Sequence, residues 1–317
     1  MIALGIFAGL SWLDMRPRPT LQGAAATGDL KEVQRILATG ADINSLDQEG
    51  FSPLMRAVQG GHFSTMDLLL DSGANVNLAG QNGNTALHIA AMQNDPRATE
   101  RLIAAGADLQ KKNSDQATPL CLAVQDNSPA VELLVAAGAF TGDMSCAGEN
   151  YLFCAVRSGN LTMLNILIER GTDLNLQAKT GACALHYAVT RSHEEVAAQL
   201  LDHGVEVNLQ DRYGLTPLHY AVRGNQLAMV RLLLEHKADT EIRGNQDRTP
   251  LLMAAQLGYA DIFETLVRHG ANLEGKLATG ETVDDLARIN RHPEIVAFIN
   301  SYCLELAERH RATKLVF

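Results

Sequence analysis

The sequence predicts an all-α solenoid of stacked helix pairs. One phrase returns along nearly the whole chain: a small turn, a Thr/Ser-Pro-Leu-like helix start, an Ala pair, and a Leu-rich run ending in Gly-Ala. Six of its seven spacings are 33 residues and one is 32, with the turn position at Gly50, Gly83, Gln116, Gly148, Gly181, Gly214, Asp247 and Gly280. One such unit cannot bury its apolar face alone, so this period indicates units that stack on one another.

The sixth unit shows why each part of the phrase forms its element. Gly214 allows the positive φ that a tight turn needs. Thr216 is suited to cap the first helix, and Pro217 fits its first turn, where a missing N–H costs nothing. The predicted second helix has apolar residues at helical spacing: Met229, Val230, Leu232, Leu233 and Leu234. The Gly-Ala that closes most units is a helix C-cap followed by entry into the next turn.

The phrases resemble those of the ankyrin-repeat family. The matching motifs are Thr85-Ala-Leu-His88, Thr118-Pro-Leu-Cys121, Cys183-Ala-Leu-His186, Thr216-Pro-Leu-His219, Thr249-Pro-Leu-Leu252 and Gly73-Ala-Asn-Val-Asn77. The resemblance covers about residues 21–309 and implies an all-α ankyrin-repeat solenoid of about nine helix-turn-helix units with short β-hairpin fingers. It also implies protein binding through the fingers and the concave face of the inner helices.

Two units depart from the phrase. The fourth replaces Thr-Pro-Leu-His with Asn150-Tyr-Leu-Phe153, and the third has Gln116 where glycine is usual, so we expect its turn to be distorted. These repeats are interpreted either as a weak point in the stack or as a place where a partner bends it.

The ends of the chain fall outside the period. Residues 1–20 form an apolar N-terminal segment, 21–309 the repeat domain, and 310–317 a C-terminal tail. The apolar stretch Ile2–Leu13 has the length of a signal-peptide core but lacks a basic region before it. It either covers the first repeat of a cytoplasmic protein, or residues 1–13 direct export or secretion. No run of eighteen apolar residues occurs, so no membrane span is predicted.

Composition narrows the classes of ligand. The net charge of −10 argues against unselective binding to nucleic acid. The five cysteines are odd in number and contain no C-x-x-C pair, which favours reduced thiols over the alternatives of a disulfide or a zinc site. No cofactor is predicted.

The ten histidines do not predict an enzyme. Most recur at equivalent places in the repeat, whereas a catalytic group need occur only once. No H-E-x-x-H motif, nucleophile grouping or Gly-rich phosphate loop occurs, so we predict no catalytic activity. The family resemblance implies that His88, His186 and His219 hydrogen-bond neighbouring hydroxyl and backbone groups.

Charge distribution leads to the predicted binding site. Acidic residues occupy mainly the outer helices, while Arg and Tyr, which often anchor protein interfaces, fall on fingers and inner-helix ends. The predicted partner-binding residues are Arg157, Tyr187, Arg191, Arg212, Tyr213, Tyr220, Arg223, Arg243 and Arg248. The sequence predicts a monomeric adaptor, scaffold or inhibitor that binds a protein with an acidic patch. The alternative is an exported effector acting on a protein of a host or neighbouring cell; solvated surface charges are the non-functional interpretation.

Overall fold

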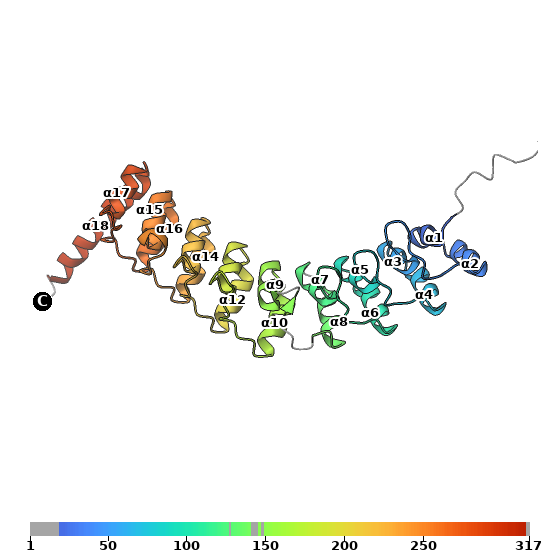
Figure 1. Ribbon diagram of the computed structural model, residues 1–317. Coiled ribbons are helices and arrows are strands. Elements are labelled where there is room, and N and C mark those ends of the chain that lie inside the picture. Colours follow the sequence, from blue (N-terminus) through green and yellow to red (C-terminus); the bar gives the residue numbers. More distant parts are fainter. Residues whose placement is uncertain (1–18, 127, 141–144, 147–148, 315–317) are drawn as a thin grey trace, which may run out of the picture. The chain divides into compact units, whose positions relative to one another are not determined.

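The computed structural model describes residues 19–126, 128–140, 145–146 and 149–314. The apolar stretch at 2–13 and most of the fourth finger therefore lie outside the described residues. The described part is built from short helices joined by loops (Figure 1). It confirms the all-α repeat architecture.

The chain divides into two compact units, residues 1–148 and 149–317. The first contains α1 (Leu21–Thr27), α2 (Leu30–Ala38), α3 (Pro53–Gln59), α4 (Phe63–Asp71), α5 (Ala86–Met92), α6 (Pro96–Ala104), α7 (Pro119–Gln125), α8 (Ala130–Ala136) and the strand β1 (Ser145–Cys146).

The second unit begins at the strand β2 (Glu149–Asn150). Its helices are α9 (Tyr151–Ser158), α10 (Leu161–Glu169), α11 (Ala184–Thr190), α12 (Glu194–Asp202), α13 (Pro217–Arg223), α14 (Leu227–Glu235), α15 (Pro250–Leu257), α16 (Ala260–Arg268), α17 (Val283–Ile289) and α18 (Pro293–Lys314), with a 3₁₀ turn at Asn245–Asp247. The last helix continues past residue 310, where the sequence predicts the tail to begin.

Leucine and alanine make the core of each unit. In the second unit, the first helix of each repeat packs on the first helix of the next, as α11 does on α13. Leu185 and Leu218 are buried at the start of these two helices, while Ala188 and Ala221 are fully buried where the helices approach each other. Burying one such leucine contributes about 1.5–3 kcal/mol, so the stacking contacts stabilise each repeat through its neighbours.

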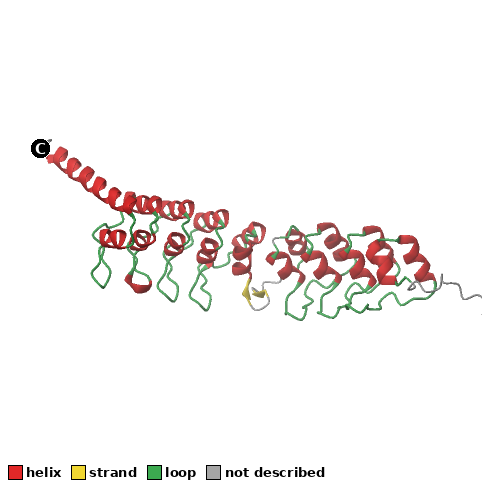
Figure 2. Ribbon diagram, turned by 90° about the horizontal axis from the view of Figure 1, so that it is seen from above, coloured by secondary structure: helices red, strands yellow, loops and turns green. Residues whose placement is uncertain are grey.

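The fingers are closed by turns more than by strands. Figure 2 shows the helices of the second unit in two rows, with the finger loops extending from one side. In the sixth unit, the N–H of Asp211 donates to the carbonyl of Leu215 at 2.9 Å, and that of Gly214 donates to Asp211 at 2.9 Å. The same two bonds recur in the fingers that turn at Gly50, Gly83, Gln116, Gly181, Asp247 and Gly280. Strands in the described residues are only two residues long.

The expected distortion of the third finger is wrong. Gln116 adopts φ 61°, close to the 72° of Gly83, and its N–H donates to Asn113 at 3.0 Å. The third finger is also tied to the second, because the N–H of Ser114 donates to the carbonyl of Asn82 at 3.0 Å. These bonds hold Gln116 in the left-handed region although a side chain disfavours it.

Candidate partner-binding surface

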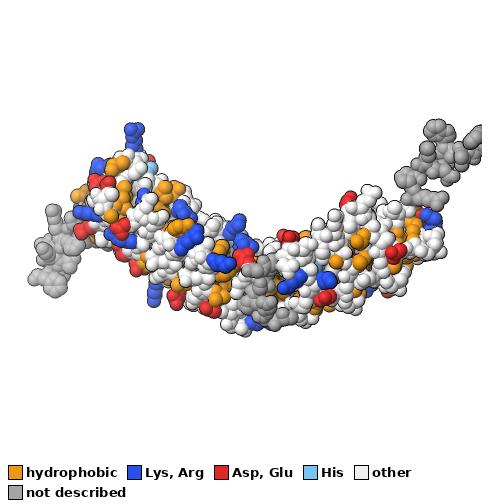
Figure 3. Space-filling view, in the orientation of Figure 1, with side chains coloured by type: hydrophobic (Ala, Val, Ile, Leu, Met, Phe, Trp, Pro, Cys, Tyr) orange, Lys and Arg blue, Asp and Glu red, His pale blue; other side chains and the backbone are white. Residues whose placement is uncertain are grey.

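All nine predicted partner-binding residues belong to the second unit. They lie on its fingers, in the middle of its first helices α11 and α13, and at the C-terminal ends of α9, α11 and α13. On the face that Figure 3 displays, Lys and Arg side chains gather over these helices. We call the nine residues together the arginine face.

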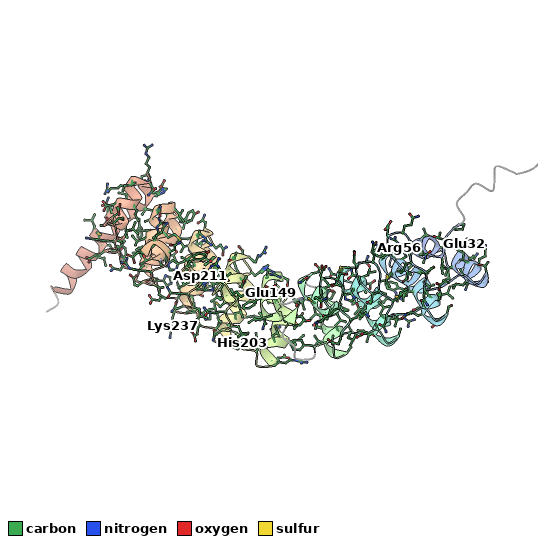
Figure 4. All side chains as sticks on the ribbon, in the orientation of Figure 1. Glu32, Arg56, Glu149, His203, Asp211 and Lys237 are labelled. Atoms are coloured by element: carbon green, nitrogen blue, oxygen red, sulfur yellow. The ribbon has the colours of Figure 1, made fainter. Side chains whose placement is uncertain are left out.

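Asp211 fixes the centre of the arginine face. Its side chain is buried, and Oδ1 accepts the backbone N–H groups of Tyr213 at 2.8 Å and Leu215 at 3.0 Å. Its other oxygen, Oδ2, accepts the hydroxyl of Tyr220 at 2.7 Å. One carboxylate therefore holds the finger in shape and joins it to α13 (Figure 4).

Two arginines stack on the tyrosines held by this carboxylate. The guanidinium of Arg223 lies 4.4 Å from the ring centroid of Tyr220, and that of Arg212 lies 4.8 Å from the ring of Tyr213. Arg212 also donates to the hydroxyl of Tyr213 at 2.7 Å. Tyr213 is 50% exposed, whereas burial and the bond to Asp211 raise the pKa of Tyr220. The four side chains present cations backed by aromatic rings.

Tyr187 and Arg157 lie on neighbouring first helices and are more enclosed. The half-buried Tyr187 packs against Phe153 with ring centroids 5.4 Å apart. Arg157 forms an ion pair with Glu149 at 2.9 Å, which ties α9 to the strand before it. The charge of Arg157 is therefore already matched within the chain.

The remaining arginines differ in how they are held. Arg243 pairs with Asp247 at 2.5 Å and donates to the carbonyl of Lys276 in the next finger at 3.0 Å. The buried Nε of Arg248 has no hydrogen-bond partner among the described residues. Arg191 is exposed at the end of α11, and within the described part of the chain it has no ion pair.

The structure thus brings some of the predicted binding residues into contact with one another. It also adds residues that the sequence analysis missed. Arg212, Tyr213, Tyr220 and Arg223 form one cluster, whereas the other five are not in it. The missed residues are Asp211 and Glu149, which position members of the face. Asp211 had a signal: it stands three residues before the turn glycine, where Asp47 and Asn113 stand in other repeats.

Comparison with known protein families agrees with this architecture. The family model described as Ankyrin repeats (3 copies) matches residues 21–113, 87–178 and 171–244. A model described as Ankyrin repeat matches residues 246–276. The chain belongs to the ankyrin-repeat family. A search of curated proteins finds no match to it.

Ankyrin repeats generally mediate protein–protein interaction and are generally non-catalytic. The fingers and first helices that carry the arginine face are elements that each repeat duplicates. Among the described residues, no helix combines the length and apolarity needed to cross a bilayer. Nor does any group of three His, Cys, Asp or Glu side chains in the described ranges have a metal-binding arrangement.

The three motif histidines of the ankyrin repeats are buried and hydrogen-bonded at both nitrogens. In His219, Nδ1 accepts the backbone N–H of Thr216 at 3.2 Å, so the ring proton is on Nε2, which donates to the carbonyl of Arg248 at 3.0 Å. His88 and His186 make equivalent bonds to Ala117 and Leu215, 29 residues away in the next repeat. Burial lowers the pKa of all three, which are therefore neutral structural links between repeats.

The prediction of five reduced cysteines is wrong at Cys121, which is disulfide-bonded. Cys154, Cys183 and Cys303 are free. Burial raises the pKa of Cys154 to about 12, and it also raises that of Cys183. Neither buried thiol has the lowered pKa of a reactive nucleophile. The sequence could not locate the disulfide, because bonding depends on which thiols the fold brings together.

Proposed function

We propose that the arginine face binds a protein partner through an acidic patch, and that the chain acts as an adaptor, scaffold or inhibitor. The observation that carries the proposal is the state of Arg191, Arg212 and Arg223. All three are exposed, and none has an ion pair with a carboxylate of the described residues. A chain of net charge −10 thus keeps a set of unmatched cations on its fingers and inner-helix ends.

The aromatic backing of these cations favours binding over mere solubility. Arg212 and Arg223 rest on tyrosine rings, so less side-chain freedom is lost when a carboxylate meets them. Tyr213 is half exposed and offers a rigid apolar surface beside them. Arg and Tyr in this combination are the side chains that most often dominate binding energy.

The paired arginines have a smaller expected role. A partner carboxylate would have to compete with Glu149 for Arg157 and with Asp247 for Arg243. We therefore place the centre of the interface on the cluster around Asp211 together with Arg191.

A charge reversal tests the proposal. A pull-down followed by mass spectrometry identifies the bound protein, and calorimetry then measures its Kd for the wild type and for Arg191→Glu/Arg223→Glu. Loss of about 2–5 kcal/mol is expected where the two charges are buried in the complex, with binding that weakens as salt rises. The matched control is Arg231→Glu, because Arg231 is exposed on the second helix α14. Equal losses from both variants, or binding insensitive to salt, would show that the face is wrong.

A further inference from the structure

The first unit contains a pocket between its first two fingers, apart from the arginine face. Its volume is about 160 Å³. Its apolar lining is Phe51 of the first finger, Met55 of α3, and Ile89 and Met92 of α5. In Figure 3, hydrophobic side chains reach the surface over these helices. An apolar cavity of about 150 Å³ holds a benzene molecule, so this pocket has room for one apolar side chain.

Amide side chains surround the opening of the pocket. They belong to Gln59, Gln81, Asn82, Asn84 and Gln93. Gln81 and Asn82 are exposed, so their side-chain donors and acceptors can meet the backbone of an incoming segment. An apolar floor with a few polar groups at its edge is typical of a binding pocket.

One wall of the pocket is held in place before any ligand arrives. The guanidinium of Arg56 lies 4.2 Å from the ring centroid of Phe51. It is fixed there by Asp47 at 2.7 Å and Glu49 at 2.8 Å, and it also donates to the side chain of Gln59 at 3.0 Å (Figure 4). Since Phe51 cannot turn into the opening without breaking this stack, the pocket is preformed.

The charges at the rim of the pocket favour one charge on the ligand residue that lies next to the bound side chain. Asp47 and Glu49 carry two negative charges against the single positive charge of Arg56, and the side chain of Glu49 is 71% exposed. Beyond this group lies a second depression, whose lining includes Leu46, Asp47 and Glu49. Leu46 is 45% exposed there. A chain segment lying across both hollows would pass directly over Glu49.

We propose that this pocket binds an extended peptide segment of a protein partner, with one side chain of Leu, Ile, Met or Phe in the pocket and a Lys or Arg next to it at Glu49. The two methionines of the lining adapt to different apolar shapes, so the pocket selects an apolar side chain without demanding one residue. The net negative rim distinguishes this site from the arginine face, which takes carboxylates.

A displayed library of random dodecapeptides tests the proposal on the full chain. We expect selected peptides to share an apolar residue with Lys or Arg within two positions. A fluorescent copy of the most enriched peptide should bind Met92→Trp at least tenfold more weakly, because Met92 is 38% exposed and the larger ring fills the pocket. The control is Leu257→Trp, which alters a 40% exposed residue at the end of α15. Glu49→Lys should weaken the same peptide at least tenfold and shift selection towards Asp or Glu beside the apolar residue.

The proposal is overturned by selection without such a motif, or by equal binding to the Met92→Trp and Leu257→Trp variants. Circular dichroism melts of each variant establish that it is folded. Because Arg191→Glu/Arg223→Glu leaves this pocket intact, loss of peptide binding in that variant would also contradict the assignment. The two binding surfaces are thus tested separately.

Discussion

Acid should destabilise this protein well before its carboxylates are protonated. His88, His186 and His219 are buried, and their pKa values are lowered by desolvation. In the unfolded chain each ring titrates near 6.5. Below that pH the unfolded state binds protons, whereas the folded rings stay neutral. A protonated Nδ1 could no longer accept the backbone N–H that it accepts in the folded state. Stability therefore falls as pH decreases from about 6.5 towards the lowered folded pKa values.

The number of buried histidines sets how steeply stability falls with pH. One histidine that titrates only in the unfolded state contributes a slope of about 0.7 kcal/mol per pH unit at pH 6.5, which approaches about 1.4 well below that pH. Between pH 6.5 and 5.5 each such histidine therefore lowers the stability by at most about 1 kcal/mol, and three by at most about 3 kcal/mol. Carboxylates with lowered pKa values, such as Asp47 and Asp285, contribute stability that is lost only near and below pH 4. The interval from pH 6.5 to 5.5 thus isolates the histidines.

Urea unfolding followed by circular dichroism at pH 7.5, 6.5 and 5.5 measures this slope. The variant His219→Gln should be less stable at pH 7.5, yet its slope should fall by about a third, since one of three titrating groups is gone. The control is His203→Gln, because His203 is exposed at the end of α12 (Figure 4). Constant stability between pH 7.5 and 5.5, or a slope that His219→Gln leaves unchanged, would refute the reasoning.

Three further measurements examine the finger, the thiols and the glycines. Asp211→Ala should lower the free energy of unfolding in urea by about 3 kcal/mol, because three hydrogen bonds are lost. Asp211→Asn should lower it by less than about 1 kcal/mol, since the amide oxygen of Asn113 makes the same two backbone bonds in the third finger. In the native protein, iodoacetamide should modify exposed Cys303 and spare buried Cys154 and Cys183, as mass spectrometry of tryptic peptides would detect; equal labelling would contradict their burial. Gly181→Ala should destabilise the protein more than Gly171→Ala in the same urea unfolding. Both glycines have positive φ, so alanine costs about 1–2 kcal/mol of backbone strain at either position. Only at Gly181 would the added Cβ also lie 2.7 Å from a backbone nitrogen of the next finger.

Local sequence patterns determined much of the repeat. The turn glycines and the Thr-Pro-Leu helix starts act within a few residues of themselves, so their spacing alone predicted where Gly214 turns and where Pro217 begins α13. The period predicted stacking, because a helix pair with this apolar pattern is stable only against a neighbour. Charge on the fingers also led to a predicted binding region between residues 157 and 248, which stays a prediction.

Only the tertiary structure showed the features that arise from contacts between repeats and between fingers and helices. Gln116 keeps a left-handed turn because backbone bonds outweigh its intrinsic preference. Nothing local to Asp211 shows that it holds Tyr220, nor does the sequence around Arg56 show that it holds Phe51 beside a pocket. Composition likewise could not place the disulfide at Cys121. These features arise where packing brings side chains together in space, and a linear pattern records composition and spacing but not which atoms meet.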